Sequence, residues 1–445
     1  MKLKALLLLV IFSLSCSLAF SQSNTIHKVK KHETIFGIAR EYGITIDELI
    51  EANPDMRKPG YDLRKGDMIV IPAKKTAKKA TTIKTVTPAA PVKSSVDVGI
   101  MLPLHDVDGD GRRMVEYYRG ILMAVEKMKG EGISINVHAW NVPIDADIRT
   151  TLLEKEAQKL DIIFGPLYSR QVKALGDFCS KNNIRMVIPF SISSTEVDRN
   201  PNIFQIYQSQ QTISDKSINA FLERFSDYHP VFIDCNDTTS NKGIFTFALR
   251  KKLEERGIQY NITNLNSSAP YFAKAFSLTK RNIVILNTGR SPELTMAMHK
   301  LDNLTSENKN VEISMFGYTE WQMYYKYNQN ETYFGKYDVY VPTTYYYNER
   351  AGVVQQFQRQ YKERFGTDMM NALPRFAITG YDHAMYFIGG AYKYKKDFKG
   401  SRSQLYATPV QTPLYFNQTK GGGYRNNAFQ LIHFKPFGAI EAVCY

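Results

Sequence analysis

From Val96 to the C-terminus, short apolar segments alternate with stretches whose apolar residues recur at helical spacing. Parallel strands joined by helices produce this alternation, because each crossover helix packs back on one face of the sheet. About 350 residues exceed one compact core, so we expect an α/β fold with two lobes. Strands are expected at 96–102, 133–140, 161–164, 185–188, 231–235, 282–286 and 312–316, and first-lobe helices at about 114–128, 152–160 and 172–181.

A lysine-rich stretch, residues 73–95, separates this region from a smaller N-terminal block. It contains six Lys, no acidic residue and almost no large apolar side chain, a composition typical of a solvated linker. We therefore predict a small domain at 26–72, a linker at 73–95 and a two-lobed domain at 96–445. Lobe I should comprise about 96–204 and 342–390, and lobe II about 205–341 with the C-terminal segment.

The overall charge of +14 would by itself suggest a nucleic-acid or anionic-membrane partner. Two lysines at the N-terminus and the six in the linker account for more than half of that excess, and residues 22–72 are balanced with eight basic and eight acidic residues. The remaining excess is small for the size of the two-lobed region. We expect no nucleic-acid partner, and an extended basic tether near an anionic wall.

The N-terminus has the pattern of a secretory signal peptide, residues 1–21. Lys2 and Lys4 precede a short apolar run, and the small residues Ala19 and Ser21 stand at the −3 and −1 positions of a cleavage site. No later stretch reaches the roughly 18 apolar residues of a membrane span, so we expect a periplasmic protein. A lipoprotein acylated at Cys16 is the less favoured alternative, because Ser13 stands where such signals usually carry an aliphatic residue.

After removal of the signal peptide three cysteines remain, Cys179, Cys235 and Cys444. An odd number permits at most one intrachain disulfide, and no two lie close enough in sequence to suggest a metal site. The simplest expectation is three buried small apolar side chains.

Residues 26–72 show the order strand, helix, helix, strand. The apolar residues Ile35, Ile38, Ala39 and Tyr42 fall on one helical face, and Asn53-Pro54 ends a second helix. The block resembles a LysM domain over its whole length. The residues in step with that family are 27–29, 33–35, 38–39, 42–44, Leu49, 53–54, Leu63, Gly66, Ile69 and 71–72, whereas His32 replaces the usual glycine.

The LysM resemblance implies binding to the N-acetylglucosamine units of peptidoglycan or chitin. The groove would lie between the loop after the first strand and the loop before the last. Amide and carbonyl groups with a small apolar contact suit an acetamido sugar, although Asn53 and Asp55 could equally serve only to shape a turn. The implied glycan-binding residues are His32, Glu33, Thr34, Ile35, Asn53, Pro54 and Asp55.

The region from Val96 onward resembles the type 1 periplasmic-binding-protein fold, in the branch that includes amino-acid receptors. Four strings carry the likeness: IIFGPLYS at 162–169, VIPFSISS at 187–194, FQRQYKERFG at 357–366 and GYDHA at 380–384. The fold implies three crossings between lobes that hinge closed on a ligand. Those crossings should lie near Gln205, near Tyr340 and after Gly389.

By the same resemblance, the loops after the third and fourth strands of the first lobe would hold a ligand's carboxylate and ammonium groups. Serine hydroxyls and free N–H groups at helix N-termini suit an anion, but Ser193 and Ser194 could instead cap the next helix. No clear acidic partner for an ammonium group is evident. The ligand-cleft residues are expected to be Leu167, Tyr168, Ser169, Ser191, Ser193 and Ser194 from the first lobe and Tyr318 and Trp321 from the second.

Ten tyrosines lie between Tyr318 and Tyr347. Aromatic faces stack on sugars and fill protein interfaces, so these residues could line a glycan-binding cleft or a docking patch. Packing within strands and at the hinge is the commoner role.

Neither a metal site nor a catalytic centre is indicated. DVDGDG at 106–111 copies the first half of an EF-hand loop, but Tyr117 stands where that loop needs a bidentate glutamate, so a polar loop bordering the cleft is favoured. No Cys, Ser or His arrangement has the signature of a hydrolase, and no cofactor motif is found. Paired carboxylates could still meet in space.

Three hypotheses follow for an exported envelope protein. The first is a non-enzymatic protein that binds peptidoglycan and captures a small solute, such as an amino acid, a peptide or a wall fragment. The second is a regulator of a peptidoglycan synthase or another envelope partner, acting through lobes that bind no solute. A peptidoglycan hydrolase is the weakest of the three.

Overall fold

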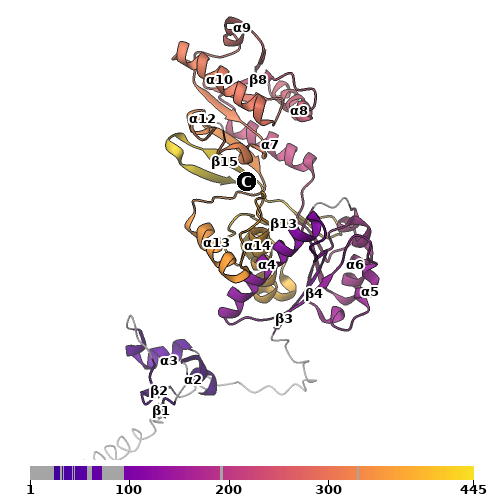
Figure 1. The fold of residues 1–445 in the computed structure, drawn as a ribbon, viewed down its shortest axis with the longest axis vertical. Helices are drawn as coiled ribbons and strands as arrows, with labels where there is room; N and C mark the ends of the chain where they lie inside the picture. Colours follow the sequence, from indigo (N-terminus) through magenta and orange to yellow (C-terminus); the bar gives the residue numbers. More distant parts are fainter. Residues whose placement is uncertain are drawn as a thin grey trace, which may run out of the picture. The chain divides into compact units, whose positions relative to one another are not determined.

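The computed structural model describes residues 25–30, 33, 35–42, 44, 46–57, 63–72, 95–190, 194–327 and 330–445. The chain divides into two compact units, Met1–Ala90 and Pro91–Tyr445, which are treated separately below (Figure 1). The predicted signal peptide, and the predicted linker apart from Ser95, lie outside the described residues.

The small unit has the predicted order of strand, helix, helix and strand. Its two strands pair antiparallel, with Thr25 opposite Ile71, and the helices cover them. Val29, Ile38, Leu49 and other apolar side chains form the core. The elements are β1 (Thr25–Lys28), α2 (Ile35–Tyr42), α3 (Ile46–Ala52), the 3-10 helix η1 (Pro54–Arg57) and β2 (Met68–Ile71).

The large unit contains two seven-stranded sheets, in which six neighbouring strands of lobe I and five of lobe II run parallel, as the alternating pattern predicts. Each sheet has its own helices, and Figure 1 shows the two groups joined by crossing segments. The strand order is β13-β14-β7-β6-β5-β3-β4 in lobe I and β16-β15-β12-β11-β10-β8-β9 in lobe II.

Lobe I is assembled from the first part of the unit and a later return of the chain. Its elements are β3 (Ser95–Leu102), α4 (Gly109–Gly130), β4 (Ser134–Asn141), α5 (Ile148–Leu152), η2 (Ala157–Lys159), β5 (Ile162–Phe164), α6 (Ser169–Asn182), β6 (Arg185–Ile188), η3 (Glu196–Asp198), β7 (Ile203–Gln205), α13 (Gly352–Phe365), α14 (Phe376–Tyr394), η4 (Lys395–Asp397), η5 (Arg402–Gln404), β13 (Phe416–Gln418) and β14 (Tyr424–Asn426).

Lobe II holds the middle of the unit and the C-terminal hairpin. Its elements are α7 (Gln210–Arg224), β8 (His229–Asp234), α8 (Lys242–Glu255), β9 (Asn261–Asn264), α9 (Ala269–Ala273), β10 (Asn282–Leu286), α10 (Ser291–Glu307), β11 (Ile313–Phe316), α11 (Trp321–Tyr324), α12 (Asn330–Lys336), β12 (Val339–Thr343), β15 (Gln430–Phe434), η6 (Pro436–Gly438) and β16 (Ile440–Cys444).

The crossings between lobes depart from the prediction at the third position. The first follows Gln205 as expected, and the second follows Thr343 at the end of β12. The third lies at 427–429, well after Gly389, because α14 continues to Tyr394 and the β13–β14 hairpin then joins the edge of the lobe I sheet beside β7. Lobe I therefore extends to Asn426 and does not end at residue 390.

The helix predicted over 152–160 is wrong. The chain forms the short α5, which ends at Leu152, and then the separate 3-10 turn η2. Leu152 and Leu160 are both buried, but Leu153 is 81% exposed between them. A continuous helix would bury Leu152 and Leu160, and so does the observed short helix followed by a 3-10 turn. The spacing of the two leucines therefore does not distinguish the two structures.

Helices α4 and α14 lie in close contact in lobe I. Gly120 and Gly380 meet there: a Cβ on Gly120 would lie 1.8 Å from the Ala377 carbonyl oxygen, and one on Gly380 would lie 2.0 Å from that of Tyr117. The Tyr117 hydroxyl also lies 3.0 Å from Nδ1 of the buried His383. This contact joins the first and last helices of the lobe, so it ties the returning chain to the start of the unit.

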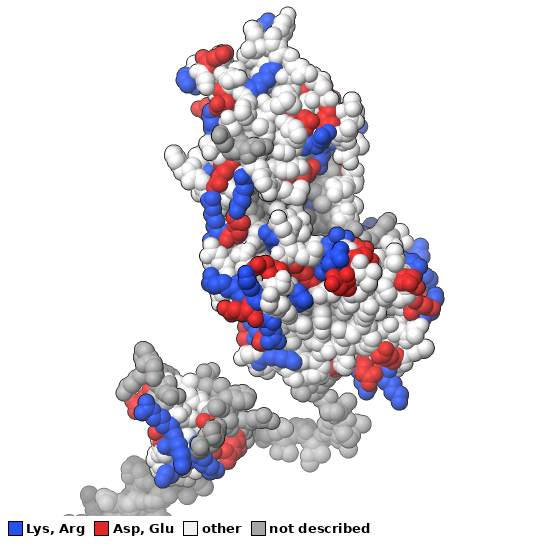
Figure 2. Space-filling view, viewed as in Figure 1, with Lys and Arg blue, Asp and Glu red and all other residues white. Residues whose placement is uncertain are grey.

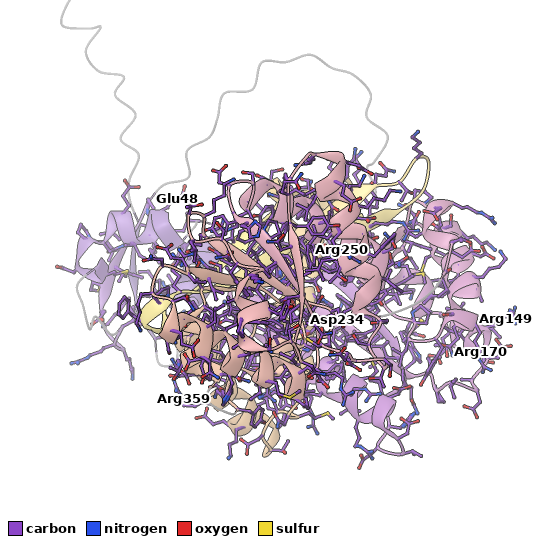
Figure 3. The ribbon with its side chains drawn as sticks, turned by 90° about the horizontal axis from the view of Figure 1, so that it is seen from above. Glu48, Arg149, Arg170, Asp234, Arg250 and Arg359 are labelled. Atoms are coloured by element: carbon purple, nitrogen blue, oxygen red, sulfur yellow. The ribbon has the colours of Figure 1, made fainter. Side chains whose placement is uncertain are left out.

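Charges of both signs are interspersed on the visible surface of the large unit (Figure 2). Arg149 and Arg170 project from the periphery in the view from above (Figure 3), and many basic side chains form exposed ion pairs such as Lys173–Asp177, at 3.0 Å. The large unit therefore presents no continuous basic face in this view, in keeping with its small share of the net charge.

Candidate binding sites in the small unit and the cleft

In the small unit, the predicted groove residue Glu33 shapes the loop that follows β1. Its carboxylate accepts a hydrogen bond from the Lys30 amide (2.7 Å) and lies 2.8 Å from Nε2 of His27, a buried ring that also contacts the Tyr42 hydroxyl. The hydrogen bond from Lys30, followed by that from His27, lowers the pKa of Glu33. This side chain therefore has a structural role at the edge of the predicted groove.

Asn53 joins the end of α3 to β2 through both ends of its amide. Nδ2 donates to the carbonyl oxygens of Leu49 (2.8 Å) and Val70 (2.7 Å), and Oδ1 accepts from the Val70 amide (2.8 Å). The side-chain amide exchanges two hydrogen bonds with the Val70 backbone, as a neighbouring strand would, so it holds the helix against the sheet. Its amide groups are occupied by the fold.

Replacing Asn53 by Ala should therefore loosen β2. Three hydrogen bonds disappear and the Val70 amide loses its acceptor, so we expect a loss of roughly 1–3 kcal/mol in the small unit. Hydrogen exchange of the Val70 amide in the full chain, followed by mass spectrometry, should become at least tenfold faster. Glu51→Ala on the exposed face of α3 is the matched control, and equal exchange in the two variants would contradict this role of Asn53.

The other predicted groove residues differ in accessibility. Ile35 packs against the core of the small unit, whereas Pro54 and Asp55 begin η1 with exposed side chains. His32 and Thr34 lie outside the described residues. Among the described residues predicted for the groove, Pro54 and Asp55 are the ones with exposed side chains.

The predicted lobe I wall of the cleft begins at the turn after β5. Gly165 has φ of 143°, and a Cβ there would lie 2.2 Å from the Met101 carbonyl oxygen, so glycine lets the turn pass close to β3. The turn leads through Leu167, which packs on the core of the lobe, to Tyr168. Tyr168 precedes α6 and donates its hydroxyl to Asp110 Oδ2 at 3.3 Å.

Burial and the neighbouring Asp110 raise the pKa of Tyr168 to about 12, so its hydroxyl remains a donor at neutral pH. Asp110 also contacts Arg113 at 2.5 Å. Asp108 caps α4 by accepting from the Gly111 amide at 2.7 Å. The acidic loop that resembles an EF-hand therefore uses these two carboxylates for a helix cap and an ion pair.

The predicted serines have different positions. Ser169 is exposed at the first turn of α6, and the Ser194 hydroxyl accepts from the Glu196 amide at 3.2 Å, as a serine at the start of a helical turn does. Ser191 and Ser193 lie outside the described residues. The alternative of a capping role thus fits Ser194, and Ser169 is free to face a ligand.

On lobe II, the prediction that Trp321 lines the cleft is wrong for its side chain. The indole is fully buried and packs on Phe334 and Tyr318, whose ring centroids both lie 6.1 Å away. Tyr318 is 5% exposed and donates its hydroxyl to the Leu286 carbonyl oxygen at 2.5 Å. Trp321 packs against Tyr318 inside the protein, because both large rings belong to one apolar core.

Tyr318 nevertheless borders a pocket of about 750 Å³ on lobe II. Its walls come from the first crossing, the N-terminal turns of α7 and α8, and the loops after β11 and β12, all at the carboxyl ends of the parallel strands, where open α/β sheets bind ligands. The lining residues are Tyr207, Gln210, Gln211, Ile213, Ser214, Ser217, Asn241, Lys242, Ile244, Phe245, Tyr318, Thr319, Glu320, Pro342, Thr344 and Tyr345.

Two charged residues of this pocket, Lys242 and Glu320, were missed by sequence reasoning. Their side chains form an ion pair of 2.7 Å, each about one quarter exposed, and the Lys242 ammonium lies 4.6 Å from the centre of the Tyr318 ring. They are 78 positions apart in the chain, so only the fold brings them together. Glu320 lies in the loop that follows the strand predicted at 312–316. That position could have marked Glu320 as a cleft residue from the sequence.

The tyrosine-rich segment serves mainly in packing. Tyr318, Tyr337 and Tyr340 are buried, and Tyr340 stacks on His433 with ring centroids 4.0 Å apart. Tyr345 is half-buried at the second crossing and lines the pocket, and burial raises its pKa to about 12. Tyr327 is 61% exposed. Of the ten tyrosines, Tyr345 is thus the one that is partly exposed and also lines the pocket.

The three described cysteines are unpaired, and Cys179 and Cys235 are buried as expected. Burial and the nearby Asp234 raise the pKa of the Cys235 thiol to about 12. Cys444 is exposed on β16, contrary to the expectation of three buried thiols. Its place on an edge strand at the C-terminus explains the exposure, because no further strand covers it among the described residues.

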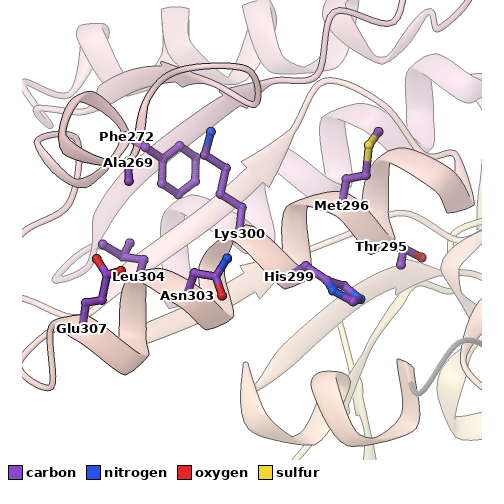
Figure 4. Close-up of a pocket in the computed structure, with 9 residues that line it drawn as sticks. All are labelled: Ala269, Phe272, Thr295, Met296, His299, Lys300, Asn303, Leu304 and Glu307. Carbon is purple, nitrogen blue, oxygen red and sulfur yellow. The ribbon is translucent and has the colours of Figure 1, made fainter.

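A second hollow of about 490 Å³ lies between α9 and α10 on lobe II (Figure 4). Lys300 spans it, with its ammonium 4.7 Å from the centre of the Phe272 ring, and donates to the carbonyl oxygens of Leu265 and Ser267. The cation is therefore used to hold the loop before α9. None of the predicted cleft residues lines this hollow.

Among the residues that the structure describes, no helix is both long and apolar enough to cross a membrane.

The two sheets and three crossings define the large unit as a type 1 periplasmic-binding-protein fold. A protein from Rhodospirillum rubrum described as a branched-chain amino acid ABC transporter is similar at a TM-score of 0.52 with 14% identity, over 78% of this chain and 100% of that one. An ABC-type branched-chain amino acid transporter from Rhodopseudomonas palustris has a TM-score of 0.46 and 12% identity, over 79% and 95% of the two chains. At such identities the likeness concerns the fold alone.

Residues 27–72 match the LysM domain family, which confirms the resemblance predicted for the small unit. A comparison with curated proteins finds no match. The LysM match suggests peptidoglycan binding by the small unit.

Proposed function

We propose that this chain is a non-catalytic envelope receptor, held on peptidoglycan by its LysM domain and binding a small solute between the two lobes of the large unit. The observation that carries the proposal is the pocket of about 750 Å³ at the carboxyl ends of the lobe II strands. It lies beside two of the three crossings, where a hinge motion would bring lobe I residues such as Tyr168 and Ser169 toward it.

The solute belongs to the classes that the fold accommodates: an amino acid, a peptide or a wall fragment. One structural neighbour is described as a branched-chain amino acid transporter component, which supports a small ligand without naming the one bound here. Signal-peptide cleavage after Ser21 would release the chain into the periplasm. The basic linker would then lie close to the anionic wall.

The LysM part of the proposal predicts retention on the wall. The full chain should sediment with purified peptidoglycan sacculi, and a chain lacking residues 26–72 should remain in the supernatant. Pro54→Gly with Asp55→Ala, which changes two exposed side chains of the groove, should reduce the sedimented fraction several-fold. Equal sedimentation with and without residues 26–72 would contradict a tethering role of the LysM domain. Release of soluble sugar or peptide from the sacculi would indicate a hydrolase.

A further inference from the structure

The charged groups at the two walls of the cleft are already neutralised within the protein. In the lobe II pocket, Lys242 and Glu320 are the charged residues among the described lining, and they pair with each other. On lobe I, Asp110 is held by Arg113 and by the Tyr168 hydroxyl. An ammonium group bound at Glu320 would compete with Lys242 for the same carboxylate, so binding a free amino acid there would disturb a partly buried ion pair.

In the loop after β8, the carboxylate of Asp237 is also occupied by partners within the protein. Asp237 accepts hydrogen bonds from Thr239 and from the Thr288 hydroxyl (2.7 Å), and lies 3.5 Å from Arg290. These contacts, with the Thr239 and Thr288 hydrogen bonds foremost, lower the pKa of Asp237 to about 2. The carboxylate stays charged, and its partners are the loops of the protein itself.

What the pocket offers instead is aromatic surface and uncharged polar groups. Tyr207 is 37% exposed at the first crossing, and Tyr345 is half-buried at the second. The C–H face of a sugar ring is weakly positive and packs on the electron-rich face of such rings. Ile213, Ile244 and Pro342 add small apolar contacts of the kind that an acetamido methyl group needs.

Hydrogen-bonding capacity is also available without charge. Among the described residues, the side chains of Gln210 and Asn241 have no hydrogen-bond partner, and both line the pocket. Ser214 and Thr344 supply hydroxyl groups in the same wall. Amides and hydroxyls both donate and accept, which matches the mixed character of sugar hydroxyls. The volume of about 750 Å³ leaves room for more than one sugar ring.

We propose that the solute bound between the lobes is a neutral saccharide of one to a few rings, stacked on Tyr207 and Tyr345 and hydrogen-bonded by Gln210 and Asn241. The inference rests on the proposed function, because it names the ligand class of the same cleft. It assigns Lys242 and Glu320 as a paired unit that offers donors and acceptors to sugar hydroxyls without binding a charged group.

Tryptophan fluorescence tests this proposal on the full chain. Trp140 and Trp321 are the two tryptophans of the sequence, and both belong to the large unit, so saccharide bound to the LysM domain gives no direct signal. Trp321 packs beneath Tyr318 at the pocket floor. The probes are N,N′-diacetylchitobiose, cellobiose and L-leucine, titrated separately with excitation selective for tryptophan.

A saturable change with either disaccharide and none with leucine is the expected result. Tyr207→Ala should then weaken that binding roughly tenfold or more, because it removes a stacking surface, while Tyr271→Ala, an exposed tyrosine on α9, should leave it unchanged. Saturation by leucine alone would overturn the saccharide assignment and leave the solute receptor standing. No change with any probe would overturn the saccharide assignment and count against the receptor as well.

Discussion

Gly380→Ala should destabilise the large unit by about 3 kcal/mol or more, at the upper end of what overpacking costs. The added methyl carbon would lie 2.0 Å from the Tyr117 carbonyl oxygen, and backbone cannot move aside as a flexible side chain can. Helices α4 and α14 would have to separate, which also breaks the contact between Tyr117 and the buried His383. The free energy of unfolding from urea titrations, followed by circular dichroism, measures the effect.

Gly130→Ala, at the end of the same helix α4, provides the control for that experiment. Nothing lies within 4 Å of a Cβ at this position, and alanine favours helix over glycine, so stability should stay the same or rise slightly. Gly120→Ala should resemble Gly380→Ala, since its Cβ would meet the Ala377 carbonyl oxygen at 1.8 Å. Equal stability of Gly380→Ala and the unchanged chain would contradict the close helix contact.

Asp382→Ala should have the second large effect. The Asp382 carboxylate is buried in α14 and accepts hydrogen bonds from three successive backbone amides, those of Val410 (2.7 Å), Gln411 (2.8 Å) and Thr412 (2.8 Å). Alanine leaves these three amides without an acceptor, at a cost of roughly 1–3 kcal/mol for each, so we expect a total of about 3–9 kcal/mol.

The same substitution should reach the second crossing, because the Gln411 carbonyl oxygen accepts from the Tyr346 amide at 2.9 Å. Urea unfolding measures the overall loss, and hydrogen exchange of residues 410–412 and 346 locates it. Asp177→Ala on the exposed face of α6 is the matched control and should change little, since its partner Lys173 is solvent-exposed. Unchanged exchange at residues 410–412 in Asp382→Ala would contradict the role assigned to this carboxylate.

The structural roles of Gly380 and Asp382 could not be predicted from the sequence. Gly380 and Asp382 lie in a string that carries the resemblance to periplasmic binding proteins, yet the string alone indicates only the fold. Their roles depend on Tyr117 and on residues 410–412, which are distant in the chain. The strands β3, β5, β6, β8, β10 and β11 were predictable because each is a largely buried apolar run. The strands β13 and β14 have three residues each and carry no periodic signal.

The sequence predicted which loops border the candidate cleft, but not which of their side chains line the lobe II pocket. Among the described residues predicted for the cleft, Tyr318 borders the lobe II pocket, whereas Leu167, Tyr168, Ser169 and Ser194 do not line it. The error at Trp321 arose because the same loop turns its second aromatic ring inward, and sequence spacing does not reveal which side of a loop is covered. Lys242 and Glu320 could not be paired from sequence, because only the order of strands in the sheet brings α8 and the loop after β11 together.

Closure of the two lobes on a solute should change the distance between them, and spin labels can measure that distance. Spin labels at Arg149→Cys on α5 and Tyr271→Cys on α9 report on lobe I and lobe II. The labels are placed in a Cys444→Ser chain that lacks residues 1–21, whose remaining thiols, Cys179 and Cys235, are buried. Labels at Arg149→Cys and Lys181→Cys, both on lobe I, give a distance that closure should not alter.

The probes are N,N′-diacetylchitobiose, cellobiose, L-leucine and D-alanyl-D-alanine, each added alone. At least one of them should produce a new population with a different interlobe distance and no change in the distance within lobe I. Tyr207→Ala should suppress that population. Identical interlobe distances with and without every one of these probes would contradict a solute receptor and favour a module that instead regulates an envelope partner.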